Sequence, residues 1–218
     1  MNHLHSHGHL LQQIARCVDA DLPHDDVLLH GRGQIGDMRL DGESWIDDEA
    51  ERKDLLLAAV LIGIVEAADG TPHILLTRRA DHLDKHSGQV AFPGGKVEAT
   101  DASPTTAALR EAHEEIGLHP DYVDVMGFLD TYETGTGFRI LPVVAKLSPG
   151  FSLTPDTNEV ADIFQVPARL ALDEANYQAH EVEWEGRQRR YYALQYEGYN
   201  IWGATAGMLM HMSRRLTV

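Results

Sequence analysis

The chain has 218 residues, of which 43% are hydrophobic and 24% are charged, as expected for a globular protein with one large domain or a domain with an appendage. The formal net charge of −16 argues against a general binder of nucleic acid or of acidic membranes, because phosphate-rich partners need a basic surface. A small anionic ligand is compatible with this charge, since a bound cation or a few arginines compensate it locally.

The chain shows no feature that would take it to a membrane or out of the cell. No apolar run approaches the roughly 20 residues that span a bilayer, and the first residues lack the basic start and apolar stretch of a secretory signal. A single cysteine, Cys17, excludes an internal disulfide and fits a reducing compartment. We therefore expect a cytoplasmic protein.

Residues 1–54 are interpreted as an N-terminal extension and residues 55–218 as the main domain. The extension begins with alternating histidines (His3, His5, His7 and His9), a pattern that by itself is only compositional evidence for metal binding. Apolar residues at helical spacing predict a short helix over 10–20. The Gly- and Asp-rich stretch over 22–54 predicts irregular structure on the surface.

The main domain opens with a predicted β-hairpin formed by residues 55–67 and 73–79. Residues 87–95 predict a short extended piece that ends in a Pro-Gly-Gly turn. Residues 104–116 predict a helix, because Ser103 is a good N-cap, Pro104 suits the first turn, and Gly117 is a typical stop.

Further strands are predicted over 123–133, 138–147, 159–166 and 191–196, before a last helix over 205–216. Met208, Leu209, Met212 and Leu216 should face the interior of the protein from this helix, and Trp202 is interpreted as a core residue. This order of elements predicts an α/β (α+β) sandwich, in which a mixed β-sheet has a helix on each side.

The helix over 104–116 carries three glutamates, Glu111, Glu114 and Glu115, which its geometry places on one face. Carboxylates at these spacings repel one another, so one interpretation is a solvated acidic face relieved by Arg110. The other is that hard divalent cations offset the repulsion, because Mg²⁺ prefers oxygen ligands on a rigid support.

The segment over 94–118 resembles the Nudix box, whose second half reads Arg-Glu-aliphatic-x-Glu-Glu-x-Gly-aliphatic. Residues 110–118 (REAHEEIGL) match this half, with Ala112 in the aliphatic place. Gly95 lies one residue farther from Arg110 than the strict pattern allows, which is a tolerable change in loop length. The upstream glutamate of the pattern is replaced by Asp101 or displaced to Glu98.

Residues 75–95 (LLTRRADHLDKHSGQVAFPGG) resemble the signature of the coenzyme A pyrophosphatase branch of this family. The matching residues are Leu75, Leu76, Thr77, Arg79, Ala80, Gly88, Phe92, Pro93, Gly94 and Gly95. Asp84 departs from the signature, since it stands where the signature has an arginine, with Lys85 beside it. The stretch over 198–209 also resembles that branch.

The resemblance implies a Nudix-type α/β/α sandwich that binds Mg²⁺ or Mn²⁺. Its metal ligands would be Glu111, Glu115, Glu114 and Gly95, and its catalytic residues Glu114, Glu115, Arg110 and Glu159. Arg110 would hold the glutamates in place, and Glu114 and Glu159 are alternative general bases. The substrate would be bound by Arg79, Lys85, Gly88, Phe92, Pro93 and Gly94.

The resemblance further implies hydrolysis of the diphosphate linkage of coenzyme A or acyl-coenzyme A, giving 3′,5′-ADP and (acyl-)phosphopantetheine. Two alternatives stay open. One is hydrolysis of another nucleoside diphosphate derivative, such as ADP-ribose or a dinucleotide polyphosphate. This alternative stays open because Asp84 replaces the arginine of the coenzyme A signature. The other is a non-catalytic nucleotide sensor on the same fold. The expected partner is a small nucleotide-like molecule, and a homodimer is among the oligomeric states compatible with the sequence.

Overall fold

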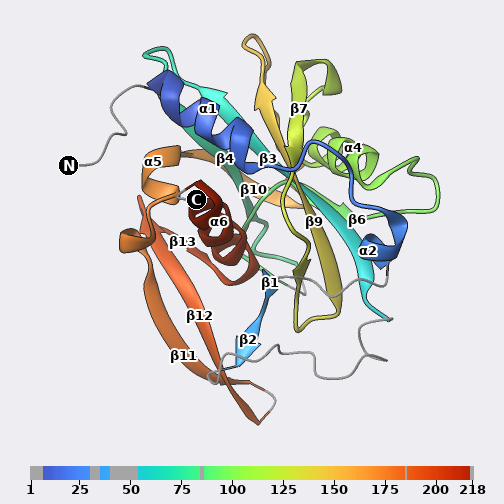
Figure 1. The fold of residues 1–218 in the computed structure, drawn as a ribbon, viewed down its shortest axis with the longest axis vertical. Helices are drawn as coiled ribbons and strands as arrows, with labels where there is room; N and C mark the ends of the chain where they lie inside the picture. The colour runs from blue at the N-terminus through green and yellow to red at the C-terminus, as the bar shows by residue number, and fades with distance from the viewer. Residues whose placement is uncertain (1–6, 30–34, 40–53, 84–85, 185, 217–218) are drawn as a thin grey trace.

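A computed structural model describes residues 7–29, 35–39, 54–83, 86–184 and 186–216. A mixed β-sheet forms its centre, with helix α4 (Pro104–Ile116) on one face and helices α1 (His7–Cys17) and α6 (Gly203–Leu216) on the other (Figure 1). The predicted sandwich with a helix on each side is therefore confirmed. His3, His5, Asp84 and Lys85 lie outside the described residues.

The main sheet is organised around β3 (Leu56–Glu66), which runs parallel to β9 (Phe138–Leu147) and antiparallel to β4 (Pro72–Arg79). The full order is β1 (Ile35–Gly36), β8 (Tyr132–Glu133), β9, β3, β4 and β10 (Val160–Pro167). The short strands β5 (Val90–Ala91), β6 (Gly94–Lys96) and β7 (Val123–Phe128) pair with β4, β3 and β9. The predicted hairpin is present as β3 and β4.

Side chains of β3 alternate between two hydrophobic clusters, as the two-residue period of a strand requires. Ala59 and Leu61 pack on the side of α4, beneath its alanine face, whereas Ile62 and Ile64 pack on the side of α1 and α6. The sheet is thus buried on both faces, which explains why residues 55–67 read as a continuous apolar run.

A second, antiparallel sheet contains β2 (Met38–Arg39), β12 (Arg187–Tyr196), β11 (Gln178–Trp184) and β13 (Tyr199–Trp202), and α6 packs against it. Only residues 191–196 of this sheet were predicted to be a strand. In β11, polar and charged residues alternate with few apolar ones, so the hydrophobic pattern that marks a buried strand is weak there.

The N-terminal helix α1 begins and ends about three residues earlier than predicted, and it contributes Leu10, Ile14 and Cys17 to the core. It ends because Asp19 leaves the helix to pair with Phe128, its backbone N–H lying 2.9 Å from the Phe128 carbonyl oxygen. The division of the chain at residue 54 stays a prediction. Within the described ranges, no helix is long and apolar enough to cross a membrane.

Two other predictions need correction. The segment over 123–133 forms two strands, β7 and β8, instead of one. The predicted turn at Pro-Gly-Gly is only a bend at Pro93, after which Gly94 and Gly95 enter β6 and pair with Val60 and Ala59 of β3. Short helices α2 (Asp25–Leu29) and α5 (Ala168–Ala171) and two 3₁₀ turns (Pro120–Tyr122 and Glu174–Asn176) complete the described elements.

Candidate active site

Helix α4 has the bounds predicted from the sequence, because both of its ends are capped. The Ser103 hydroxyl accepts a hydrogen bond from the backbone N–H of Thr106 at 3.2 Å. At the other end Gly117 adopts the left-handed conformation, with φ of 69°, and its N–H donates to His113 at 2.9 Å. The last turns of α4, which carry the glutamates, are therefore held in a single position against the sheet.

Arg110 lies at the centre of an ion-pair network. Its Nε and Nη2 donate to the two oxygens of Asp101, each at 3.0 Å, and its Nη1 donates to Glu111 and Glu114, each at 2.9 Å. The bidentate contact lowers the pKa of the Asp101 carboxyl group and raises that of Arg110. Of the two acids considered for the upstream position, Asp101 contacts Arg110, whereas the backbone N–H of Glu98 donates to Asp101.

The three glutamates occupy different environments, which does not fit the interpretation of a uniformly solvated acidic face. The side chain of Glu114 is 56% exposed, that of Glu111 17% and that of Glu115 only 5%. Glu115 accepts a hydrogen bond from the Gly94 N–H at 3.1 Å, and its Oε1 lies 3.9 Å from Nη1 of Arg79. The sequence places the three on one side of a helix, but the depth of each depends on what packs over it.

Burial raises the pKa of Glu115 to about 7, and the negative charges of Glu111 and Glu159 act in the same direction, while the Gly94 N–H and Arg79 oppose them. Burial likewise raises the pKa of Glu111, and the charge of Glu159 contributes to that rise. The charge of Glu159, one of the exposed residues before β10, therefore acts on two carboxylates at the end of α4.

Gly94 and Gly95 are required where β6 passes the glutamates. A Cβ on Gly95 would lie 2.4 Å from Oε1 of Glu111, so only glycine lets that carboxylate lie against the strand. Gly94 has φ of 154°, and a Cβ there would lie 2.4 Å from the carbonyl oxygen of Ala59. Gly95 thus allows α4 to approach β6 closely, and Gly94 allows β6 to approach β3.

Glu111, Glu114 and Glu115 of α4 supply carboxylate oxygens, the kind of ligand that a hard cation prefers. The carboxylate of Glu111 lies against Gly95, and Glu115 is buried, with Arg79 3.9 Å away. In the described part of the chain, however, no three acidic, histidine or cysteine side chains converge closely enough to hold a metal ion as they stand. The hydrogen bonds from Arg110 to Glu111 and Glu114 account for this, because they draw both carboxylates toward the guanidinium group.

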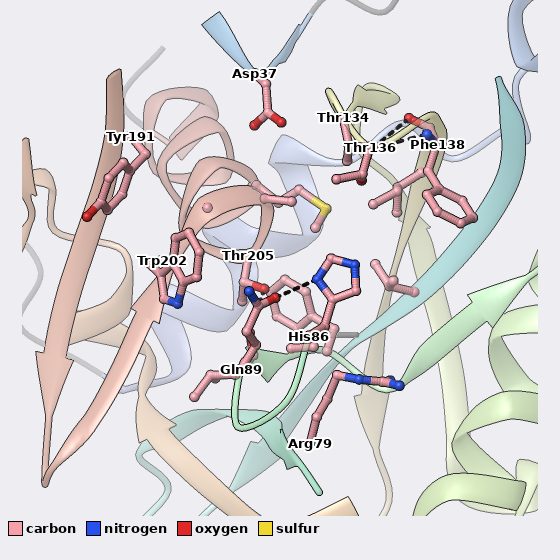
Figure 2. A pocket seen from close by; sticks show the side chains of 18 of the residues that line it. Asp37, Arg79, His86, Gln89, Thr134, Thr136, Phe138, Tyr191, Trp202 and Thr205 are labelled. Atoms are coloured by element: carbon pink, nitrogen blue, oxygen red, sulfur yellow. Dashed lines mark hydrogen bonds between the residues drawn. The ribbon is translucent and has the colours of Figure 1, made fainter. Parts of the chain in front are cut away.

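A pocket of about 570 Å³ opens between the main sheet and the second sheet (Figure 2). Phe92, Phe138, Tyr191 and Trp202 supply aromatic walls, and Thr205 of α6 lies at its side. Arg79 and Asp37 lie on opposite sides of the pocket in Figure 2. Since Arg79 also lies beside Glu115, one residue connects this pocket with the glutamates of α4.

Among the residues predicted to bind substrate, Arg79 and Phe92 line the pocket, whereas Gly88, Pro93 and Gly94 do not. Gly88, with φ of 67°, shapes the loop that carries the pocket residue Gln89. Pro93 is buried, and its carbonyl oxygen accepts a hydrogen bond from Leu61 at 2.8 Å. Lys85 lies outside the described residues.

Several pocket residues were missed by sequence reasoning. Trp202 was predicted to be core, but it is half-buried and lines the pocket, in edge-to-face contact with Tyr191. Asp37 and Arg189 had no motif to mark them. In the sequence, Asp37 is one acid within the segment predicted to be irregular, and Arg189 belongs to a basic run before the strand predicted over 191–196.

Comparison with known proteins identifies the family. The model of the NUDIX domain matches residues 56–195. An uncharacterized Nudix hydrolase NudL of Enterobacter sp. (strain 638) is 41% identical over 159 residues, which cover 73% of this chain and 82% of that protein. The NudL protein of Salmonella paratyphi B is 42% identical over 161 residues, covering 74% and 83%.

Solved structures resemble the chain more distantly. A Nudix hydrolase from M. smegmatis, RenU, has a TM-score of 0.45 and 22% identity, covering 61% of this chain and 79% of that one. The NUDIX domain of Shewanella oneidensis NrtR complexed with ADP ribose has a TM-score of 0.42 and 20% identity, covering 57% and 79%. The family match and the NudL relatives decide the assignment: the chain belongs to the Nudix hydrolase family.

Proposed function

We propose that the protein hydrolyses the diphosphate linkage of coenzyme A or acyl-coenzyme A, giving 3′,5′-ADP and (acyl-)phosphopantetheine. The observation that carries the proposal is the position of Arg79, which belongs to the coenzyme A signature over 75–95, lines the pocket and lies 3.9 Å from Glu115. A diphosphate held by Arg79 would meet the glutamates of α4 at one end, while the rest of a large substrate extends into the pocket.

The proposed cofactor is Mg²⁺ or Mn²⁺, held by Glu111 and Glu115 with Glu114 and the carbonyl of Gly95 as further ligands. The oxygen donors, and the close approach of the Glu111 carboxylate to Gly95, support this assignment. Such a cation neutralises charge that develops on the phosphate oxygens and lowers the pKa of a water molecule. Entry of the cation would require Glu111 and Glu114 to give up part of their contact with Arg110.

The remaining groups position the reactants. Arg79 lines the pocket, so its guanidinium group would offer a phosphate oxygen charged hydrogen bonds. Asp101 holds Arg110, and Arg110 in turn orients Glu111. Water attacks one phosphorus, and the bond from that phosphorus to the bridging oxygen breaks, so the second phosphate leaves with that oxygen.

Of the two candidate general bases, Glu159 is better supported than Glu114. Its backbone carbonyl accepts a hydrogen bond from Ala80 at 2.8 Å, directly after Arg79, and its charge acts on both Glu111 and Glu115. Glu114, by contrast, is engaged with Arg110. A base beside Arg79 would lie near the diphosphate and the attacking water.

The pocket supports a substrate with a large group beyond the diphosphate. Its walls are mainly apolar and aromatic, and its volume of about 570 Å³ is typical of sites for drug-sized ligands. A minimal substrate such as inorganic diphosphate would leave these walls in contact with water. The pocket therefore favours a nucleotide conjugate over a simple phosphate anhydride.

The test is a turnover panel of coenzyme A, acetyl-coenzyme A, ADP-ribose and diadenosine tetraphosphate, each with Mg²⁺, with Mn²⁺ and with EDTA. We expect the highest kcat/KM for a coenzyme A compound and no turnover in EDTA. A higher kcat/KM for ADP-ribose would replace the coenzyme A assignment with the other nucleoside diphosphate alternative, and full turnover in EDTA would refute the metal requirement. Tight binding of coenzyme A without cleavage would favour the sensor. Light scattering on the same samples tests for a homodimer.

A further inference from the structure

Residues 35–39 connect the two sheets that wall the pocket. Ile35 and Gly36 form β1, which pairs in parallel with Tyr132 and Glu133 of β8 in the main sheet. After Asp37 the chain joins the second sheet as β2, which pairs antiparallel with β12 at residues 189–190. This bridging segment (residues 35–39) precedes residues 56–195, the part matched by the family model.

Asp37, the middle residue of the bridging segment, is buried and forms polar contacts with residues of both sheets. Its Oδ1 accepts a hydrogen bond from the hydroxyl of Tyr132 at 3.0 Å, and its Oδ2 accepts one from the N–H of Gly135 at 2.9 Å. On the other side Nη2 of Arg189, in β12, lies 2.6 Å from Oδ1. One carboxylate thus joins the main sheet to the second sheet.

These contacts lie at the pocket wall. Asp37 and Arg189 both line it, together with Thr134 and Thr136 on either side of Gly135. Asp37 and Arg79 lie on opposite sides of the pocket in Figure 2, so the bridging segment is far from the proposed diphosphate position. A substrate that extends from Arg79 across the pocket would approach Arg189 with its far end.

We infer that Arg189 is a specificity-determining residue for the part of the substrate farthest from the diphosphate, a group bearing acceptor oxygens, and that Asp37 is the residue that positions it. A half-buried guanidinium group needs a counter-charge, and Asp37 supplies one in a fixed direction. The inference rests on the proposed function only insofar as the pocket holds the substrate beyond the diphosphate. It is independent of which nucleotide conjugate is cleaved.

A double-mutant cycle with Asp37→Asn and Arg189→Gln tests this inference, because residues that act through one another are not additive. The substrate is whichever of coenzyme A and ADP-ribose the wild type cleaves with the higher kcat/KM. We expect each single variant to raise KM about tenfold, with kcat within about twofold of the wild type. The double variant should raise KM no more than the larger single effect.

Asp130→Asn is the matched control, since Asp130 also pairs with an arginine, Arg215 at 3.1 Å, but does not line the pocket. Its KM should equal that of the wild type. Arg189→Lys keeps the charge without the planar fork and should still raise KM, which preserves the test if Asp37→Asn does not fold.

Three results would overturn the inference: an unchanged KM in the single variants, KM increases that multiply in the double variant, or losses of kcat with KM unchanged. The last would indicate a merely structural ion pair. If neither compound is cleaved, the proposed function is refuted but this inference is not. The double-mutant cycle is then measured on the dissociation constant of coenzyme A, by isothermal titration calorimetry. Absence of coenzyme A binding would then refute this inference as well.

Discussion

The end of α4 and the pocket beside it are held together by different interactions. Around α4, Arg110 forms charged hydrogen bonds with Asp101, Glu111 and Glu114, all within one short stretch of chain. The pocket is walled by aromatic and apolar side chains, and the ion pair between Asp37 and Arg189 in its wall joins residues that are far apart in the sequence. The proposed catalytic network is thus local in the sequence and charged, whereas the proposed substrate pocket is assembled from distant segments.

The largest expected effect is on turnover, from Glu115→Gln. This change removes the charge of a buried proposed metal ligand, so we expect kcat to fall at least about 100-fold, or about 2.7 kcal/mol of barrier. Steady-state kinetics with Mg²⁺ measure it. Glu174→Gln, which removes a surface partner of Arg214, serves as the control and should keep normal kinetics. A near-normal rate for Glu115→Gln would mean that the carboxylate is not part of the reaction.

The same substitution should stabilise the metal-free protein. The folded pKa of Glu115 is about 7, above the ordinary value of 4.5, so the folded state binds the proton more tightly. The contribution of Glu115 to stability is unchanged below pH 4.5, falls as the pH rises from 4.5 to 7, and stays reduced by about 3 kcal/mol above that. Denaturant unfolding in EDTA should therefore show Glu115→Gln to be more stable than the wild type at pH 8 and nearly equal at pH 4.5. An equal difference at both pH values contradicts this.

Asp101→Asn tests how far the local network orients the glutamates. The amide keeps one acceptor for Arg110 but loses the charge and the bidentate contact. We expect kcat to fall about tenfold, as when the partner of a metal ligand is removed. Asp101→Glu should recover most of the activity, since it restores a carboxylate that can accept from Arg110. Full activity in Asp101→Asn would show that Arg110 orients the glutamates without the charge of Asp101.

Gly95→Ala and Gly94→Ala, two substitutions in β6, should affect different properties: the first turnover, the second stability. A Cβ at Gly95 meets only the movable carboxylate of Glu111, so kcat should fall about fivefold with little change in Tm. A Cβ at Gly94 meets backbone atoms of Ala59 and Val60 and requires a strained φ, so this variant should lose about 2 kcal/mol of stability. Thermal unfolding and kinetics on both variants check the contrast, and a reversed pattern refutes it.

A feature could be predicted from the sequence where its residues lie close together in the chain. Helix α4, its caps and the β3–β4 hairpin follow from local pattern, and the Nudix box is contiguous in the chain. The burial of Glu115 could not be predicted, because it depends on β6 packing over the helix end. Neither could the pocket role of Trp202 or Asp37, since both need the second sheet to be placed first, and β11 has too weak an apolar pattern to reveal that sheet.

The smallest expected effect concerns the pocket, through Trp202→Leu. Trp202 lines the pocket in edge-to-face contact with Tyr191, with 5.4 Å between the ring centroids. Loss of one aromatic wall should weaken substrate binding in the ground state and the transition state alike, so KM should rise about threefold while kcat stays the same. Phe151→Leu removes a comparable edge-to-face contact, with Tyr122 outside the pocket lining, and should leave KM unchanged. Equal KM values for wild type and Trp202→Leu would mean that the substrate does not reach this wall. A fall in kcat would mean instead that pocket and glutamates are coupled, so the division between local chemistry and distributed binding would not hold.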